Sequence, residues 1–267
     1  MQKLRLCLVG CGYLNGIVAE AWKRGMLPEY EIVGVMGRSQ EKAEKMAEDI
    51  GCQHCQSQEE LLNLHPDYIV EAASVACLKE LAVPALEQKS SLVVLSIGAF
   101  ADAEFYGQVQ QAAAKSGAKV HIASGAIGGF DVLRTITLMS MAEQKTLTAG
   151  IETRKGPKSL QNTPLFEEKL MEDGDPTHVF EGNAKEAIAL LPTKVNVAVA
   201  ASLATAGPDE TSVNIHSVPG MVGDDHKITA EIDGVKTVVD TYSSTSAIAG
   251  WSVVSLLQNL VSPIMFG

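Results

Sequence analysis

The segment Leu4-Arg-Leu-Cys-Leu-Val-Gly-Cys-Gly-Tyr-Leu-Asn-Gly16 carries the strongest structural signal in the chain. Residues 4–9 form a short, mostly apolar run that predicts a buried strand, and a Gly-x-Gly turn ends it. Apolar side chains then recur at helical spacing over 14–25. Glycines at such a junction let the backbone approach a pyrophosphate, which the free N–H groups of the helix bind. The segment therefore predicts a dinucleotide site, with contacts from Gly10, Gly12, Tyr13 and Leu14.

The third glycine of this motif would stand at position 15, but the chain has Asn15 there and Gly16 one place later. A Gly-x-Gly pair by itself is also compatible with a purely structural turn. Its position at the start of a long strand–helix alternation favours the cofactor interpretation.

About 125 residues alternate strand and helix patterns, which is typical of a parallel sheet. We predict six strands, as in two mononucleotide-binding halves placed side by side. The strand ranges that the pattern defines are 4–9, 31–36, 68–73, 92–96 and 119–123.

The pattern changes after Ser124. Strands are expected at 146–153, 213–217, 228–232 and 237–242, and helices at 131–142, 184–191, 195–205 and 246–260. Some of these strands alternate apolar and polar residues, as in an antiparallel or mixed sheet with one covered face. The predicted class is α/β: a Rossmann-type doubly wound parallel sheet in a dinucleotide-binding domain, and a smaller α/β substrate domain with a mixed sheet. The expected domains are 1–124 and 125–244, with the C-terminal helix, 245–267, packing back on the first.

The composition excludes several classes of protein. The chain has 267 residues, 46% of them apolar, which is enough for a core. A net charge of −11 argues against a nucleic-acid partner, and no apolar run is long enough for a membrane span. The odd number of cysteines, five, favours a reducing cytoplasm over a disulfide framework. Cys52-Gln-His-Cys55 has no second ligand pair at zinc spacing, so we expect no metal.

The end of the second strand bears on cofactor choice. NAD sites usually carry an Asp or Glu there for the ribose 2′-OH, and this chain has Gly37-Arg38-Ser39 instead. Arg38 and Ser39 offer donors to a 2′-phosphate, so NADP is preferred to NAD. The alternative is that Arg38 stacks on adenine or points into solvent.

Several further segments resemble the L-aspartate dehydrogenase family over essentially the whole chain. The most specific is Ser124-Gly-Ala-Ile-Gly-Gly-Phe-Asp131. The other matching segments are Val70-Glu-Ala-Ala-Ser74, Val94-Leu-Ser-Ile-Gly-Ala99, Thr153-Arg-Lys-Gly-Pro157, Val179-Phe-Glu-Gly182, Asn196-Val-Ala-Val-Ala200 and Leu260-Val-Ser-Pro-Ile-Met-Phe-Gly267.

The resemblance implies oxidation of L-aspartate to iminoaspartate, which hydrolyses to oxaloacetate and ammonia or feeds NAD biosynthesis, and the reverse amination. It also implies that Ala126 and Asn196 line the cofactor site. We add Ala73 and Ser74, which end the Val70–Ser74 segment, as cofactor contacts.

The resemblance also implies a catalytic histidine, and two candidates lie close together. Asn214-Ile-His216 has the family's Asn-x-His form, whereas Asp224-Asp-His226-Lys-Ile228 does not. Register favours His226, because the family histidine opens the strand that follows a proline turn, here at Pro219. A histidine can act as base and then as acid near neutral pH. Asp224 replaces the family's Asn and should raise the pKa of His226 if the two are in contact.

A dianionic substrate needs cations. Arg154, Lys155 and Lys158 are the densest basic cluster of the second half, with a solvated loop as the alternative interpretation. We predict substrate contacts from Arg154 and Lys155, and from Gly125 and Ile127 through the backbone of the glycine-rich loop. A homodimer is expected from the apolar strand faces. The rival functions are a dehydrogenase of another amino or hydroxy acid, and a non-catalytic dinucleotide sensor.

Overall fold

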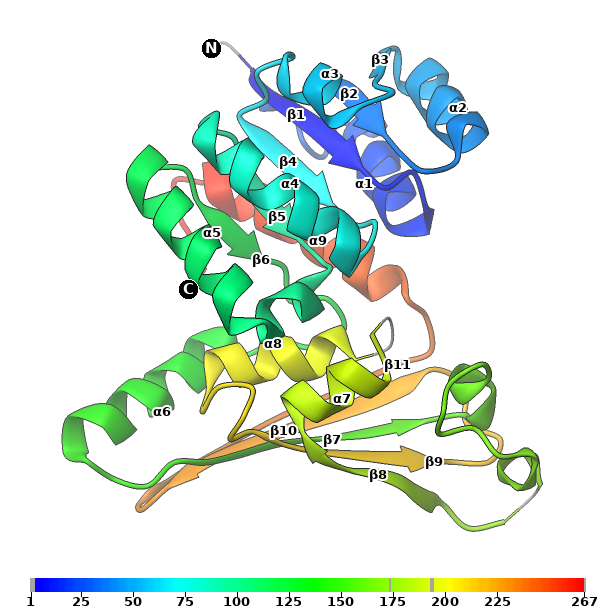
Figure 1. Ribbon diagram of the computed structural model, residues 1–267, viewed down its shortest axis with the longest axis vertical. Helices are drawn as coiled ribbons and strands as arrows, with labels where there is room; N and C mark the ends of the chain where they lie inside the picture. Colours follow the sequence, from blue (N-terminus) through cyan, green and yellow to red (C-terminus); the bar gives the residue numbers. More distant parts are fainter. Residues whose placement is uncertain (1–2, 173, 193–194, 267) are drawn as a thin grey trace. The chain divides into compact units, whose positions relative to one another are not determined.

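The computed structural model describes residues 3–172, 174–192 and 195–266, and the chain divides into two compact units (Figure 1). Unit 1 contains 1–125 and 247–267, and unit 2 contains 126–246. Within the described ranges, no helix has both the length and the apolar content that a bilayer crossing requires.

Unit 1 is built on a six-stranded parallel sheet in the order β3-β2-β1-β4-β5-β6, which confirms the predicted Rossmann-type class. The order reverses beside β1, so the carboxyl ends of β1 and β4 meet at the crevice where such sheets bind ligands. The strands are β1 (Leu4–Val9), β2 (Tyr30–Met36), β3 (Gln53–His54), β4 (Tyr68–Glu71), β5 (Ser91–Val94) and β6 (Val120–Ile122). The strand without a predicted range is β3, because two residues are too short for any alternation to show.

Helices cover both faces of this sheet. They are α1 (Tyr13–Lys23), α2 (Gln40–Ile50), α3 (Gln58–Leu62), α4 (Val75–Glu87), α5 (Ala103–Ser116) and α9 (Ala247–Val261), with a 3-10 turn, η1 (Ile97–Ala101), after β5. The last helix, α9, returns to unit 1 and packs along α1 (Figure 1). Its Val253, Val254 and Leu257 join the same core as Leu6 and Leu8 of β1. Burial of these apolar side chains is the main force that ties the C-terminal helix to this sheet.

Unit 2 is a five-stranded mixed sheet in the order β11-β10-β7-β9-β8, in which β7 and β9 are parallel and the other neighbours antiparallel. Its strands are β7 (Thr148–Lys155), β8 (Thr177–Asn183), β9 (Ser212–Ser217), β10 (Asp224–Ile232) and β11 (Val235–Ser243). Three helices lie over one face (Figure 1): α6 (Phe130–Glu143), α7 (Ala184–Leu190) and α8 (Asn196–Ala204). Two 3-10 turns, η2 (Pro157–Leu160) and η3 (Glu168–Met171), lie between β7 and β8.

The predicted strand boundaries in unit 2 need correction. β7 continues to Lys155 instead of ending at 153, β10 begins at Asp224 instead of 228, and β8 was not predicted. The extra residues carry polar side chains at positions whose side chains are buried, such as Lys155 and His226. These polar residues break the alternation of apolar and polar positions from which strands are predicted, so the predicted strands are shorter than the observed ones.

Candidate functional site

Gly10 follows β1 in unit 1 and its backbone touches the turn after β4. A Cβ on this residue would lie 2.6 Å from the carbonyl oxygen of Ala72 and 2.9 Å from Cα of Ala73. Its φ of +96° is also a conformation that L residues rarely adopt. Gly12, by contrast, is exposed at the N-cap of α1 with no atom within 4 Å of its Cβ position. The two glycines thus leave open space directly before the free N–H groups of a helix, which is the environment a phosphate binds.

Asn15 explains the missing third glycine. Its side chain is fully buried, and its Nδ2 donates to the carbonyls of Val9 (2.9 Å) and Gly10 (3.0 Å). Asn15 therefore fixes the strand-to-helix turn with its side chain, and the helix packs closely enough without a glycine at this position. Tyr13 and Leu14 begin α1, where Tyr13 is largely exposed and Leu14 partly buried.

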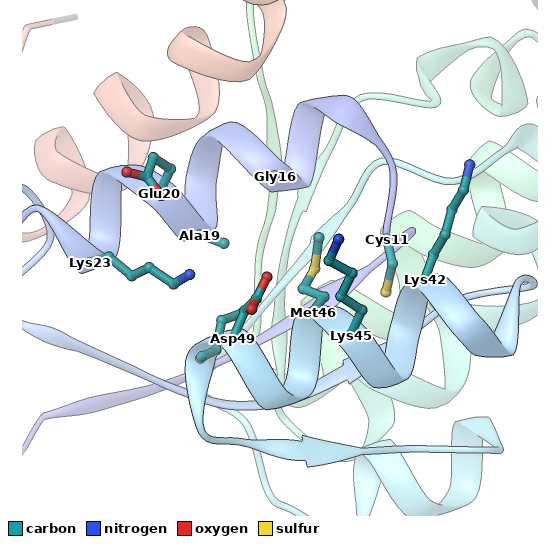
Figure 2. A pocket seen from close by; sticks show the side chains of 10 residues that line it. Cys11, Gly16, Ala19, Glu20, Lys23, Lys42, Lys45, Met46 and Asp49 are labelled. Carbon is teal, nitrogen blue, oxygen red and sulfur yellow. The ribbon is translucent and has the colours of Figure 1, made fainter.

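Arg38 and Ser39 lie exposed between β2 and α2, and Ser39 is the N-cap of α2. No ion pair holds Arg38 among the residues that the structure describes. A groove of about 270 Å³ lies between α1 and α2 (Figure 2). The side chains that give it a mixed charge are Lys23, Lys42, Lys45, Glu20 and Asp49.

Ala73 and Ser74 form the turn between β4 and α4, on the same edge of the sheet as Gly10. Both are exposed, and the Ser74 hydroxyl caps α4 by accepting from the N–H of Cys77 (3.2 Å). The structure therefore brings these residues next to the Gly10 turn.

His226 is buried on the helix-covered face of the unit 2 sheet, with 3% of its surface exposed. Its neighbour on β7 is Thr153, and Thr153 Oγ1 lies 3.0 Å from His226 Nδ1. Because Nδ1 is engaged in this way, Nε2 is the ring nitrogen left to exchange a proton.

Lys155 lies on the same face, one alternation beyond Thr153, and is 3% exposed. Its Nζ is 3.4 Å from Asp224 Oδ2, and its neighbour on β9 is Ser217. The Ser217 hydroxyl is buried and has no hydrogen-bond partner among the described residues. The ammonium group of Lys155 and the hydroxyl of Ser217 thus lie next to each other near His226. Together they can donate hydrogen bonds to a carboxylate.

Arg154 and His216 lie on the opposite face of the sheet. Successive residues of a strand point to opposite sides, so Arg154 points away from Lys155 and pairs instead with Glu152 (2.8 Å). His216 is its neighbour on β9 and stacks on His178, with 4.8 Å between ring centroids. The predicted basic cluster of Arg154 and Lys155 is therefore divided between the two faces of the sheet, because β7 continues to Lys155.

The glycine-rich loop crosses from one unit to the other. In unit 1, the N–H of Gly125 donates to Ser252 Oγ (3.0 Å). In unit 2, Ala126 is partly buried, Ile127 is buried and Gly129 is the N-cap of α6. Asn196 is the first residue of α8, a helix that packs on β7.

The electrostatics around His226 are unusual. Burial, followed by the positive charge of Lys155, lowers the pKa of His226 to about 4, and Asp224 acts in the opposite direction. The expected sign of the Asp224 effect is therefore right, but the other two effects outweigh it. His226 is neutral at pH 7, as a general base must be.

We expect opposite changes in the pKa of His226 from two neighbouring substitutions. Lys155→Met removes a cation and should raise it, whereas Asp224→Asn removes an anion and should lower it. The measurement is an NMR titration of the His226 ring in all three proteins. Because the folded pKa is below the unfolded value near 6.5, the stabilising contribution of neutral His226 is complete above that pH and is lost as the pH falls through 4. A wild-type pKa at or above 6.5 would contradict this picture.

Sequence reasoning missed Thr153 and Ser217 as neighbours of His226 and Lys155. Both are small hydroxyl residues in strands, and such residues are too common in strands to indicate a functional site by themselves. Their signal lies in the strand pairing, which places them opposite His226 and Lys155 only once the register is known.

The chain is similar to known proteins over essentially its whole length. Residues 135–260 match the family model "Aspartate dehydrogenase, C-terminal", and residues 10–123 match "Homoserine dehydrogenase, NAD binding domain". An L-aspartate dehydrogenase of Methanococcus maripaludis is 32% identical, with 99% of each chain covered, and one of Methanocaldococcus jannaschii is 28% identical at the same coverage. The crystal structure of aspartate dehydrogenase from Thermotoga maritima is similar over all of both chains, with a TM-score of 0.77 and 27% identity. The chain belongs to the L-aspartate dehydrogenase family.

Proposed function

We propose that this protein is a nicotinamide-dinucleotide-dependent L-aspartate dehydrogenase, which oxidises L-aspartate to iminoaspartate or aminates oxaloacetate in reverse. The observation that carries the proposal is the buried cluster of His226, Lys155 and Ser217, which joins a neutral proton acceptor to donors for a carboxylate. The activity named for the relatives points to the same reaction.

The residues of unit 1 fit a dinucleotide. Gly10 allows a backbone approach that a Cβ would block, and Gly12 leaves open space before the helix. We assign the pyrophosphate to this turn, and further contacts to Ala73 and Ser74. We keep Ala126 and Asn196 of unit 2 as cofactor contacts on the strength of the family resemblance. A dinucleotide held by these residues would supply the nicotinamide as acceptor for the hydride from the α-carbon of aspartate.

His226 supplies the proton chemistry of this proposal. With Nδ1–H donating to Thr153 Oγ1, the Nε2 lone pair takes a proton from the substrate ammonium group, because only the neutral amine gives up hydride readily. After this proton has passed to solvent, the same nitrogen accepts a proton from the water that attacks the imine. The resulting imidazolium returns its proton to the departing ammonia.

Lys155 binds a substrate carboxylate and in doing so tunes His226. The positive charge of Lys155 lowers the pKa of His226 in the free protein. A carboxylate placed on Lys155 offsets that charge, so the bound substrate makes His226 a stronger base. Asp224, at 3.4 Å from Lys155, competes with the substrate for the same cation. Gly125 and Ile127 remain proposed backbone contacts of the substrate.

Turnover with a matched pair of acids tests this function. L-aspartate and L-malate share a carbon skeleton and both carboxylates, and differ in the amino or hydroxyl group. We expect reduction of NADP or NAD with aspartate, and the reverse with oxaloacetate plus ammonia. Turnover with malate alone would assign the protein to hydroxy-acid oxidation. Cofactor binding without turnover on either acid would favour a sensor.

We propose NADP as the preferred cofactor, supported by exposed Arg38 and Ser39 where NAD sites carry a carboxylate. Replacing Arg38 with alanine is expected to raise the Kd for NADPH by about tenfold and that for NADH by less than about twofold. The reason is that the 2′-phosphate, which only NADPH carries, loses the guanidinium as its partner. Fluorescence titration measures both constants, and Arg24→Ala, at the C-cap of α1, is the matched control. Equal losses for the two cofactors would mean that Arg38 contacts their common part.

The homodimer remains a prediction. Val238 and Tyr242 support it, because both are exposed apolar side chains on the sheet face opposite the helices, at 47% and 60% exposure. A solution mass near twice 28.3 kDa would bear it out.

A further inference from the structure

Glu71, the last residue of β4, is a buried carboxylate in unit 1 with 0% exposure. No ion pair neutralises it among the described residues, and its four hydrogen bonds all come from neutral donors. Oε1 accepts from the N–H groups of Ala73 (2.8 Å) and Ser74 (3.0 Å) and from the hydroxyl of Ser96 (2.9 Å). Oε2 accepts from the N–H of Ser96 (3.2 Å). Burying a charge is costly. The four donors around the Glu71 carboxylate therefore indicate that the carboxylate has a specific role at this position.

These bonds join two turns at the carboxyl edge of the sheet. Ala73 and Ser74 belong to the turn after β4, and Ser96 belongs to the turn after β5. The Gly10 turn of β1 packs directly against Ala72 and Ala73. Because β1, β4 and β5 are neighbours in the sheet, the three turns form one continuous edge with Glu71 beneath it.

The place of this edge relative to the dinucleotide follows from the sheet order. The end of β2 receives the adenosine ribose, and the β1–α1 turn receives the pyrophosphate. The nicotinamide half therefore lies on the other side of β1, toward β4 and β5. This step rests on the proposed function.

We propose that Glu71 is a positioning residue for the nicotinamide half of the cofactor. Its carboxylate draws the backbone N–H groups of 73, 74 and 96 inward and so fixes the surface that the turns present to the ligand. It contacts no reacting atom. A carboxylate is required because it only accepts hydrogen bonds, and four donors converge on it.

Glu71→Gln tests this role with nearly unchanged volume. The amide has one oxygen, so its NH₂ group must face one of the N–H donors, and the turn must shift. We expect the Kd for NADPH to rise about tenfold, from the cost of one unpaired buried donor. The kcat at saturating cofactor should also fall, because a displaced nicotinamide is poorly placed to take the hydride, whereas the KM for aspartate should stay within about threefold because unit 2 is untouched. Ser96→Ala, which removes one of the four donors, should raise the Kd by about threefold.

Tyr30→Phe is the matched control. It also removes a buried hydrogen bond of unit 1, from the Tyr30 hydroxyl to the carbonyl of Leu257 (2.8 Å), but far from the proposed edge. A merely structural role for Glu71 would make both variants less stable and leave both Kd values at the wild-type level, which would overturn this inference alone. Failure of the wild type to bind NADPH or NADH would overturn the proposed function and this inference together. If Glu71→Gln does not fold, the Kd of Ser96→Ala decides.

Discussion

Replacing His226 with alanine is expected to lower kcat by about 10² to 10⁴, the usual range for a lost general acid–base group. His226 is the buried, neutral imidazole whose Nδ1 is held by Thr153, and the alanine variant lacks the Nε2 that carries the proposed proton transfers. The Kd for NADPH should change by less than about twofold, because the turn to which we assign the pyrophosphate lies in unit 1. Steady-state kinetics with aspartate and a fluorescence titration of NADPH give the two quantities.

His216→Ala is the matched control, since His216 is a histidine of the same sheet on the opposite face. It should retain near wild-type kcat. His226→Gln guards against a folding defect, because it fills most of the buried volume without an imidazole. Full activity in both His226 variants, together with loss of activity in His216→Ala, would show that the catalytic histidine was assigned in the wrong register.

Much of unit 1 could be predicted from sequence because its signals are local. A parallel strand buried on both faces is a continuous apolar run, and the glycines that end it are visible in the same few residues. Gly10 is a good example, since its need for a positive φ arises within the turn itself. By contrast, β3 is two residues long and is a strand only because it pairs with β2.

The site in unit 2 was harder to predict because it depends on pairing between distant strands. His226 and Thr153 are 73 positions apart, and nothing local relates them. The alternation of buried apolar and exposed polar residues would have placed Arg154 and Lys155 on opposite faces. It cannot be recognised in the sequence, because Lys155 is a charged residue at a buried position. A site that buries polar groups necessarily breaks the pattern from which strands are read.

The net charge of −11 is compatible with a dianionic substrate in this arrangement. Most charged side chains are exposed and screened over about 8 Å at physiological ionic strength. Lys155 is buried, so its attraction for a carboxylate acts at a lower effective dielectric and over a short distance. A single buried cation thus outweighs many distant surface anions, and Asp224, 3.4 Å from Lys155 Nζ, opposes it directly.

Replacing Gly10 with alanine is expected to lower the free energy of unfolding by about 3 kcal/mol. The residue has φ of +96°, where an L side chain costs about 1–2 kcal/mol. The new Cβ would also overlap the carbonyl oxygen of Ala72 at 2.6 Å, and forcing an extra carbon into packed backbone costs about 1–3 kcal/mol more. Because the obstacle is main chain and not a flexible side chain, the β4–α4 turn itself must move. Urea unfolding of the whole chain, followed by the fluorescence of Trp22 on α1 and Trp251 on α9, measures the loss.

Two other glycines of the same segment separate stability from binding. Gly12→Ala meets no atom within 4 Å and keeps an allowed φ of −100°, so its unfolding free energy should stay within about 0.5 kcal/mol, while the Kd for NADPH rises because the pyrophosphate needs that open space. Gly16→Ala lies inside α1 with equally open space and should stabilise unit 1 by about 0.5–1 kcal/mol. A Gly10→Ala protein as stable as Gly16→Ala would refute the close contact with Ala72. Reduced stability in Gly10→Ala, with reduced binding but normal stability in Gly12→Ala, would show that the first glycine shapes the turn and the second admits the ligand.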